Sequence, residues 1–226
     1  MEKISIGIAD DHALFRRGMI TMLASEKKLQ FVIEANDGQD LVNLLKVKEE
    51  PDVILLDLRM TKLNGIETIH YLRQHHPEIK VIIISVHDDQ DIIEHLFENG
   101  ANAYLNKNSD PEEVISAINN VMVYDFHFNP AAKSALRGIE KRQRKSKIKS
   151  LDNNGLSKRE IDVLKLICNE CSTSQIAKEL KISVRTVETY RINLLNKSSS
   201  KNIAGLVLFA IKNNIVETLD LKIRNN

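Results

Sequence analysis

The segment Pro51-Asp52-Val53-Ile54-Leu55-Leu56-Asp57-Leu58-Arg59-Met60 joins a short apolar run to an acidic residue. Residues 53–56 are all apolar, which predicts a strand buried on both faces, as in a parallel sheet. Asp57 follows directly, and the carboxyl ends of parallel strands are where open α/β sheets bind ligands. Because Asp is also common in ordinary turns, this segment alone leaves a structural and a functional interpretation open.

Strand and helix patterns alternate on both sides of this segment. Further strands are predicted over 4–9, 31–35, 80–85 and 103–106, and helices over 12–25, 41–48, 66–75, 91–99 and 111–123. In the first of these helices, Leu14, Met19, Met22 and Leu23 recur at helical spacing. Strand–helix repeats of this kind predict an α/β domain with a five-stranded, parallel, doubly wound sheet covered by helices on both faces.

Polar side chains end four of the predicted strands: Asp10 and Asp11, then Asp57, Ser85 and Lys107. Because the carboxyl ends of parallel strands share one edge of a sheet, we expect these side chains to converge. Three neighbouring carboxylates repel one another unless a cation neutralises them, and hard oxygen ligands suit Mg²⁺. A carboxylate can also attack phosphorus to form an aspartyl phosphate, while a Lys and a hydroxyl bind the phosphoryl oxygens.

With these residues, the region 3–123 resembles the receiver domain of two-component response regulators. The resemblance implies a flavodoxin-like fold, phosphorylation by a sensor histidine kinase, and a protein that is no enzyme beyond catalysing part of its own phosphorylation and dephosphorylation. By role, the implied site residues are the phosphoacceptor Asp57, the Mg²⁺ ligands Asp10, Asp11, Asp57 and the backbone carbonyl of Arg59, and the phosphate-binding and switch residues Ser85, Tyr104 and Lys107.

Two positions depart from the usual receiver pattern. Thr61 stands where the family usually has Pro after Met60, and Asn108 stands where Pro often follows Lys107. The resemblance implies a cis peptide bond after Lys107 even without Pro, at a cost of ~3 kcal/mol. Neither departure removes a chemical group from the site.

Charge divides the chain into an acidic front and a basic back. Residues 1–132 hold 12 Lys and Arg against 22 Asp and Glu, whereas residues 133–149 hold 8 against one. Residues 150–226 hold 12 against 8, so two domains with different partners are indicated, the basic one suited to nucleic acid. Residues 124–151 are interpreted as a basic, solvated linker, with an arm that contacts DNA phosphates as the alternative.

Region 152–217 predicts a small all-α domain of four helices. Ser157-x-x-Glu160 and Ser172-x-x-Gln175 are capping boxes, Ser183 caps a helix over 184–197, and Ser200 can cap a last one. A short helix, a three-residue turn and a longer basic helix form a helix-turn-helix pattern. In the longer helix Val184, Val187, Tyr190 and Leu194 are expected to face inward.

The sequence of this region also resembles the LuxR-type DNA-binding domain, and together with the receiver it resembles the NarL/FixJ class of transcriptional regulators. The resemblance places Glu188, Thr189 and Ile192 at the base-facing positions, although relatives often carry Lys in place of Glu188. Ser198-Ser199 replaces the family's frequent Leu-Gly, which leaves the turn geometry there open. The side chains considered for DNA contacts are Arg185, Thr186, Glu188, Thr189, Arg191, Ile192 and Lys197.

The sequence thus predicts a phosphorylation-dependent DNA-binding transcriptional regulator that binds double-stranded DNA as a homodimer. The alternatives are an aspartyl-phosphate phosphohydrolase, and a constitutive DNA-binding protein whose receiver serves only protein interaction. Absence of an 18-residue apolar run and of a leader predicts a cytoplasmic protein without membrane contact. Cys168 and Cys171 suit a reducing compartment, and helix packing is favoured over a zinc or redox role for them.

Overall fold

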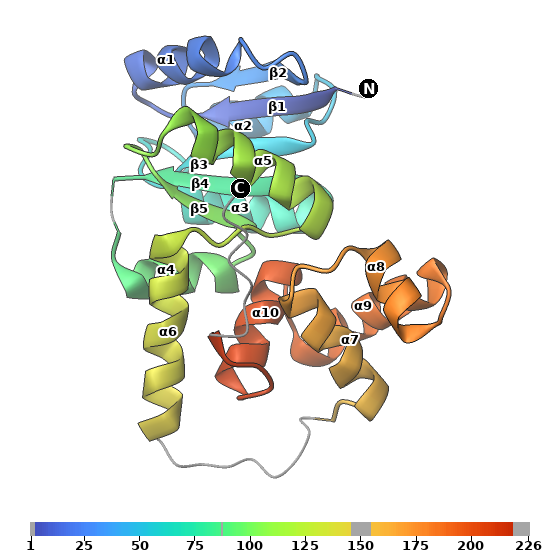
Figure 1. The fold of residues 1–226 in the computed structure, drawn as a ribbon. Helices are drawn as coiled ribbons and strands as arrows, with labels where there is room; N and C mark the ends of the chain where they lie inside the picture. Colours follow the sequence, from blue (N-terminus) through green and yellow to red (C-terminus); the bar gives the residue numbers. More distant parts are fainter. Residues whose placement is uncertain (1–2, 87, 146–154, 219–226) are drawn as a thin grey trace.

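A parallel sheet of five strands, in the order β2-β1-β3-β4-β5, forms the centre of the N-terminal domain (Figure 1). The computed structural model of the chain describes residues 3–86, 88–145 and 155–218. The strands are β1 (Ile4–Ala9), β2 (Leu29–Ala35), β3 (Val53–Asp57), β4 (Lys80–Ser85) and β5 (Ala103–Asn106). This strand order is that of flavodoxin-like folds, so the predicted architecture is confirmed.

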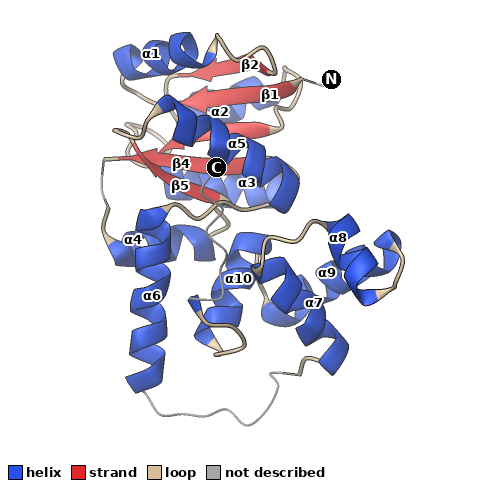
Figure 2. Ribbon diagram, viewed as in Figure 1, coloured by secondary structure: helices blue, strands red, loops and turns tan. Residues whose placement is uncertain are grey.

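Helices cover both faces of the sheet (Figure 2). They are α1 (Ala13–Leu23), α2 (Gly38–Leu45), α3 (Gly65–His75), α4 (Gln90–Glu98) and α5 (Pro111–Tyr124). One apolar cluster joins alternate strand residues such as Ile8 and Leu55 to α1 and α5, and the other joins residues such as Ile54 and Leu56 to α2, α3 and α4. The sheet is buried on both sides, as the apolar run before Asp57 predicts.

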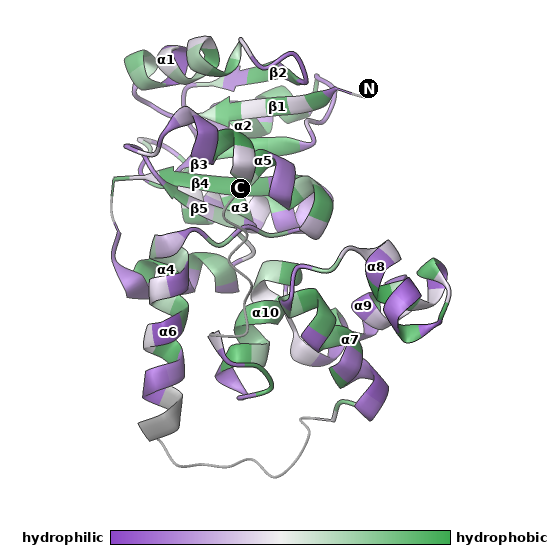
Figure 3. Cartoon of the chain, viewed as in Figure 1, coloured by the Kyte–Doolittle hydropathy of each residue, from purple (hydrophilic) through white to green (hydrophobic). Residues whose placement is uncertain are grey.

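Figure 3 shows the sheet as the most continuously hydrophobic part of the N-terminal domain. The helices are more mixed, and in α1 only part of the predicted apolar set is buried. Met19 and Leu23 pack on the sheet, whereas Leu14 is 88% exposed and Met22 is 43% exposed. Helical spacing alone therefore overestimated the buried face of α1.

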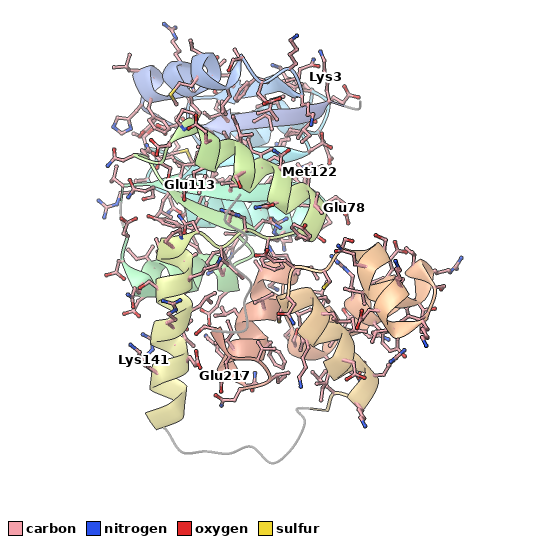
Figure 4. The ribbon with its side chains drawn as sticks, viewed as in Figure 1. Lys3, Glu78, Glu113, Met122, Lys141 and Glu217 are labelled. Carbon is pink, nitrogen blue, oxygen red and sulfur yellow. The ribbon has the colours of Figure 1, made fainter. Side chains whose placement is uncertain are left out.

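Residues 130–145 form a helix, α6 (Pro130–Lys145), and the prediction of a solvated linker is wrong for them. Ala132, Ala135, Leu136 and Ile139 follow the i, i+3, i+4, i+7 spacing of one helix face, and all four are buried. Lys141, labelled in Figure 4, is exposed, whereas the charged residue Glu140 is buried at 7% exposure. Residues 124–129 of the predicted linker are described too, and Phe126 and Phe128 among them are buried. The last part of that linker, residues 146–151, lies outside the described residues, as do residues 152–154.

The C-terminal domain consists of α7 (Lys158–Cys168), α8 (Thr173–Leu180), α9 (Val184–Ser198) and α10 (Ile203–Lys212). Both predicted capping boxes are present, and Ser183 caps α9 by accepting a hydrogen bond from the Thr186 amide. Ser199 ends α9 with φ of 55°, so the turn closes without the glycine that relatives often have. No described helix combines the length and the apolar character that crossing a membrane requires.

Helix α10 packs against α4 and α6 as well as against its own domain, as Figure 1 shows. The Asn202 side chain accepts from the Gly205 amide to cap α10 and donates to the carbonyl of Gly100 at 2.6 Å. Lys212, in the last turn of α10, lies 2.7 Å from Glu94 and 2.5 Å from Glu98 on α4. The two domains are therefore docked on each other through α4.

Candidate phosphorylation and nucleic-acid sites

Asp10, Asp57 and Lys107 meet at the carboxyl edge of the sheet, as the sequence predicts. Asp10 and Asp57 are 2% and 4% exposed, at the ends of β1 and β3. Lys107 Nζ lies 2.7 Å from Asp10 Oδ2 and 2.8 Å from Asp57 Oδ2. The same ammonium group stands over the Phe15 ring, 4.7 Å from its centroid, which adds a cation–π attraction.

One cation faces more than one carboxylate at this edge, which leaves excess negative charge. Burial raises the pKa of Asp57, and the neighbouring charge of Asp10 adds to this, while the hydrogen bond from Lys107 opposes it. Burial alone would lower the pKa of Lys107, but its hydrogen bonds to Asp10 and Asp57 raise it overall. The protonated lysine and the buried acids form a site that can accept a further cation.

The donor set fits a divalent cation such as Mg²⁺. Asp10, Asp11, His12 and Asp57 each offer a ligand atom within 4.8 Å of the others. Asp11 Oδ1 is buried without a hydrogen-bond partner, and His12 Nδ1 lies 2.9 Å from it. Burying a carboxylate oxygen without a hydrogen-bond partner costs free energy, and coordination of a metal ion by that oxygen offsets the cost. The sequence reasoning missed His12, whose signal is its place directly after the acid pair.

Arg59 and Ser85 lie beside the acid cluster. The Arg59 amide donates to Asp57 Oδ1 at 3.4 Å, so the Arg59 backbone is adjacent to the acid that it is expected to support. Ser85 ends β4 with 1% exposure, and its carbonyl accepts from the Lys107 amide at 2.8 Å. The peptide bond between Lys107 and Asn108 is trans, like every other in the described residues, so the prediction of a cis bond at this position is wrong.

Tyr104 is fully buried, and its hydroxyl donates to Asp88 Oδ1 at 2.6 Å. Asp88 belongs to the loop that connects Ser85, the last residue of β4, to α4. The sequence reasoning did not identify Asp88, because an acid in a run of loop acids carries no signal of its own.

A buried arginine supports the acid pair from α1. Arg16 donates to the Asp10 carbonyl at 2.6 Å, to Glu34 at 2.8 Å and to the Asn36 side chain at 2.8 Å. These bonds join the ends of β1 and β2 under the site. Sequence reasoning missed Arg16, whose apolar surroundings become evident only in the folded chain.

Helices α8 and α9 form the predicted helix-turn-helix. Val187 and Leu194 are buried and Tyr190 is half-buried, as expected, whereas Val184 is 47% exposed and does not face inward. Arg185, Glu188, Thr189 and Ile192 lie on exposed positions of α9, with Thr186 half-buried beside them.

The two remaining basic residues are engaged within the protein. Lys197 Nζ lies 2.8 Å from the buried Glu160 carboxylate and donates to the Gly155 carbonyl. Arg191 is paired with Asp125 of the N-terminal domain, and Lys80 lies 2.5 Å from the same carboxylate. Arg191 is half-buried, whereas Lys197 lies on an exposed position although it is paired.

A cavity of about 470 Å³ lies between the two domains beside the Arg191–Asp125 pair. Glu188 and Ile192 of α9 line it, and Glu78, labelled in Figure 4, lines it from the N-terminal domain. The N-terminal domain therefore borders the face of α9 that carries the expected base-contacting residues.

Cys168 is buried in the core of the C-terminal domain, and Cys171 packs against the same core. In the part of the chain that the structure describes, the one grouping suited to a metal ion is the Asp10 cluster, not these cysteines. The burial of Cys168 and the packing of Cys171 agree with the predicted packing role.

Residues 6–119 match the family model of the response regulator receiver domain, and residues 154–210 match that of the LuxR family of bacterial regulatory proteins. The transcriptional regulatory protein DegU of Brevibacillus brevis is 35% identical over 95% of this chain and 96% of its own. The response regulator GacA of Pseudomonas aeruginosa is 32% identical over 95% of this chain and 98% of its own. A structure of the RcsB response regulator of Salmonella typhimurium shares the fold, with 23% identity and a TM-score of 0.55 over 92% of this chain and 97% of that one.

The chain therefore belongs to the two-component response regulators that join a receiver domain to a LuxR-type DNA-binding domain. Its N-terminal domain is the receiver, and α7–α10 form the DNA-binding domain.

Proposed function

We propose that Asp57 accepts a phosphoryl group from a histidine kinase and that this controls the binding of α9 to double-stranded DNA. The observation that supports the proposal best is the meeting of Asp10, Asp57 and Lys107 at one edge of the sheet, with Lys107 Nζ 2.7 Å from Asp10 and 2.8 Å from Asp57. The protein then acts in the cytoplasm as a transcriptional regulator, without an enzyme activity apart from turnover of its own phosphate.

In the transfer step an Asp57 carboxylate oxygen attacks the phosphorus of the phosphohistidine. The new O–P bond replaces the N–P bond, and the departing imidazole of the kinase takes up a proton. Asp10, Asp11, Asp57 and the Arg59 carbonyl would hold Mg²⁺, which supplies positive charge to the phosphoryl oxygens. Lys107 shifts its hydrogen bond from Asp57 to a phosphoryl oxygen, and the Ser85 hydroxyl donates to another.

Arg191 links this chemistry to DNA binding. While Arg191 is paired with Asp125, the arginine cannot contact a DNA phosphate, and the receiver borders Glu188 and Ile192. Movement of Ser85 toward the phosphoryl group shifts the loop leading into α4, against which α6 and α10 pack. Phosphorylation thereby favours the arrangement in which α9 is released, a population shift between two states.

Once released, the DNA-binding domains of two chains bind DNA together as a homodimer on two half-sites. One recognition helix reads too few base pairs for specific binding, so two modules related by a dyad double the contact. Arg185 and the freed Arg191 neutralise phosphates, while Glu188, Thr189 and Ile192 face the bases.

The test combines phosphate labelling with selection of duplexes from a random library. Full-length protein, treated with acetyl phosphate and Mg²⁺, should be labelled at Asp57 and recover an enriched duplex with two related half-sites. Asp57→Asn should remain unlabelled and recover far less of it. Equal labelling of Asp57→Asn would refute the phosphoacceptor assignment, and equal recovery with and without phosphate would favour a constitutive DNA-binding protein.

A further inference from the structure

Asp88 connects the loop before α4 to strand β5. Its Oδ1 atom accepts one hydrogen bond from the Tyr104 hydroxyl at 2.6 Å and another from Asn106 Nδ2 at 2.8 Å. Both donors stand on β5, two residues apart and therefore on the same face of the strand, so a single carboxylate oxygen of the loop binds the buried Tyr104 and the half-buried Asn106.

The two donors lead to the phosphate-binding lysine. Asn106 immediately precedes Lys107, whose amide donates to the Ser85 carbonyl and whose ammonium group contacts Asp57. Hydrogen bonds from Tyr104 and then Asn106 lower the pKa of Asp88, so its carboxylate is charged at neutral pH. Burial and the bond to Asp88 raise the pKa of Tyr104, so the phenol keeps its proton and donates.

The chain after Asp88 enters α4, against which the DNA-binding domain packs. The next residue, Asp89, caps α4 by accepting from the amides of Asp91 and Ile92. Gln90, the first residue of α4, donates to Ser134 on α6 at 3.1 Å. The position of Asp88 therefore bears on the position of α4, and through α4 on α6 and α10.

We propose that Asp88 is a positioning residue of the switch, holding Tyr104 inward and anchoring the start of α4 to the strand that carries Lys107. Tyr104 then stays buried in both states, and when Ser85 moves, Asp88 and the start of α4 shift together with the end of β5, to which Asp88 is bonded. The inference rests on the proposed function, since it assigns the residue through which that site controls its output. Of the switch residues that the resemblance implies, Ser85 therefore moves and Tyr104 keeps its place.

The physical reason lies in what rotation of Tyr104 would cost. The ring is fully buried while the DNA-binding domain is docked, and its hydroxyl bonds to a charged acceptor. Rotating the side chain outward would break that bond, which disfavours the rotated state about tenfold or more, and would empty a ring-sized space in the core. Movement of Ser85, a small side chain, breaks neither.

The first test follows Tyr104 directly, by fluorine NMR of the full-length protein containing 3-fluorotyrosine. Tyr104→Phe identifies the Tyr104 signal among those of the four tyrosines. We expect that signal to stay protected from a soluble paramagnetic reagent both without and with beryllofluoride and Mg²⁺, which mimic the phosphoryl group. Strong broadening of the Tyr104 signal by the reagent in either condition would overturn the proposal.

Two Asp88 variants separate a positioning role from a general loss of charge. Asp88→Ala should expose or broaden the Tyr104 signal, whereas Asp88→Asn, which keeps an acceptor oxygen, should retain a protected signal. Asp110→Ala is the matched control, because Asp110 is an exposed acid whose side chain caps no helix. An Asp88→Ala spectrum like that of wild type would contradict the proposal.

The second readout is the ratio of DNA affinities with and without beryllofluoride, for the duplex selected above. Asp88→Ala should reduce this ratio about fivefold or more while acetyl phosphate labels Asp57 within about twofold of the wild-type rate. If beryllofluoride leaves the DNA affinity of wild type unchanged, the proposed function is wrong, and the NMR experiment still decides the role of Asp88.

Discussion

Replacing Asp125 by Asn should release the DNA-binding domain without phosphorylation. Asp125 has φ of 67°, a conformation that Asn tolerates better than other residues of its size, so the backbone should be preserved. The side chains of Asp125 and Arg191 are 23% and 16% exposed, which limits solvent screening of their ion pair. A charge-assisted hydrogen bond of this kind contributes about 1.5–3 kcal/mol, and Asn retains part of it as a neutral acceptor. The loss of about 1–2 kcal/mol shifts the docked state toward the released state by roughly 5- to 30-fold.

The assay is fluorescence anisotropy of a labelled duplex, titrated with unphosphorylated protein at fixed salt. Asp125→Asn should bind more tightly than wild type by up to that factor, whereas both proteins should bind alike once phosphorylated. Lys80→Ala serves as the matched control, because it removes the other partner of Asp125 and leaves the pair with Arg191. Wild-type affinity of unphosphorylated Asp125→Asn, with the phosphorylated enhancement intact, would refute the reasoning that this pair restrains α9.

Three further outcomes are expected. Lys107→Ala should still take up phosphate on Asp57 but lose most of the increase in DNA affinity, and normal activation of the variant would show that Lys107 has another role. His127, whose pKa burial lowers to about 4, binds its proton in the unfolded chain first, so stability should fall between about pH 6.5 and 4 by ~3 kcal/mol. Thermal melts of wild type and His127→Gln should show a steeper loss for wild type at acid pH, and parallel losses would contradict this. DNA affinity should fall steeply with salt concentration, and two chains should bind each duplex at saturation. Arg185→Ala should reduce the slope of log affinity against log salt concentration by about one, and an affinity independent of salt would exclude the phosphate contacts.

Much of the receiver follows from local sequence. The apolar run 53–56 is short and uninterrupted, so it predicts a strand buried on both faces wherever it lies in the sheet. Parallel strands place their carboxyl ends together, and for this reason Asp10, Asp57 and Lys107 could be assigned to one site before their distances were known. Capping boxes at Ser157 and Ser172 likewise predicted helix starts from nearest neighbours alone.

Only the tertiary structure determined which segments and side chains of this chain contact one another. The buried apolar positions of α6 are two alanines, a leucine and an isoleucine among many charged residues, and they become a buried face because α4 and α10 cover them. Arg191 is equally suited to a phosphate or a carboxylate, and its pairing with Asp125 depends on how the domains dock. Asp88 acquires its role because the fold brings Tyr104 and Asn106 to one carboxylate oxygen. Sequence periodicity determines which residues share a face, whereas long-range packing determines what that face meets, since the latter depends on segments far apart in the chain.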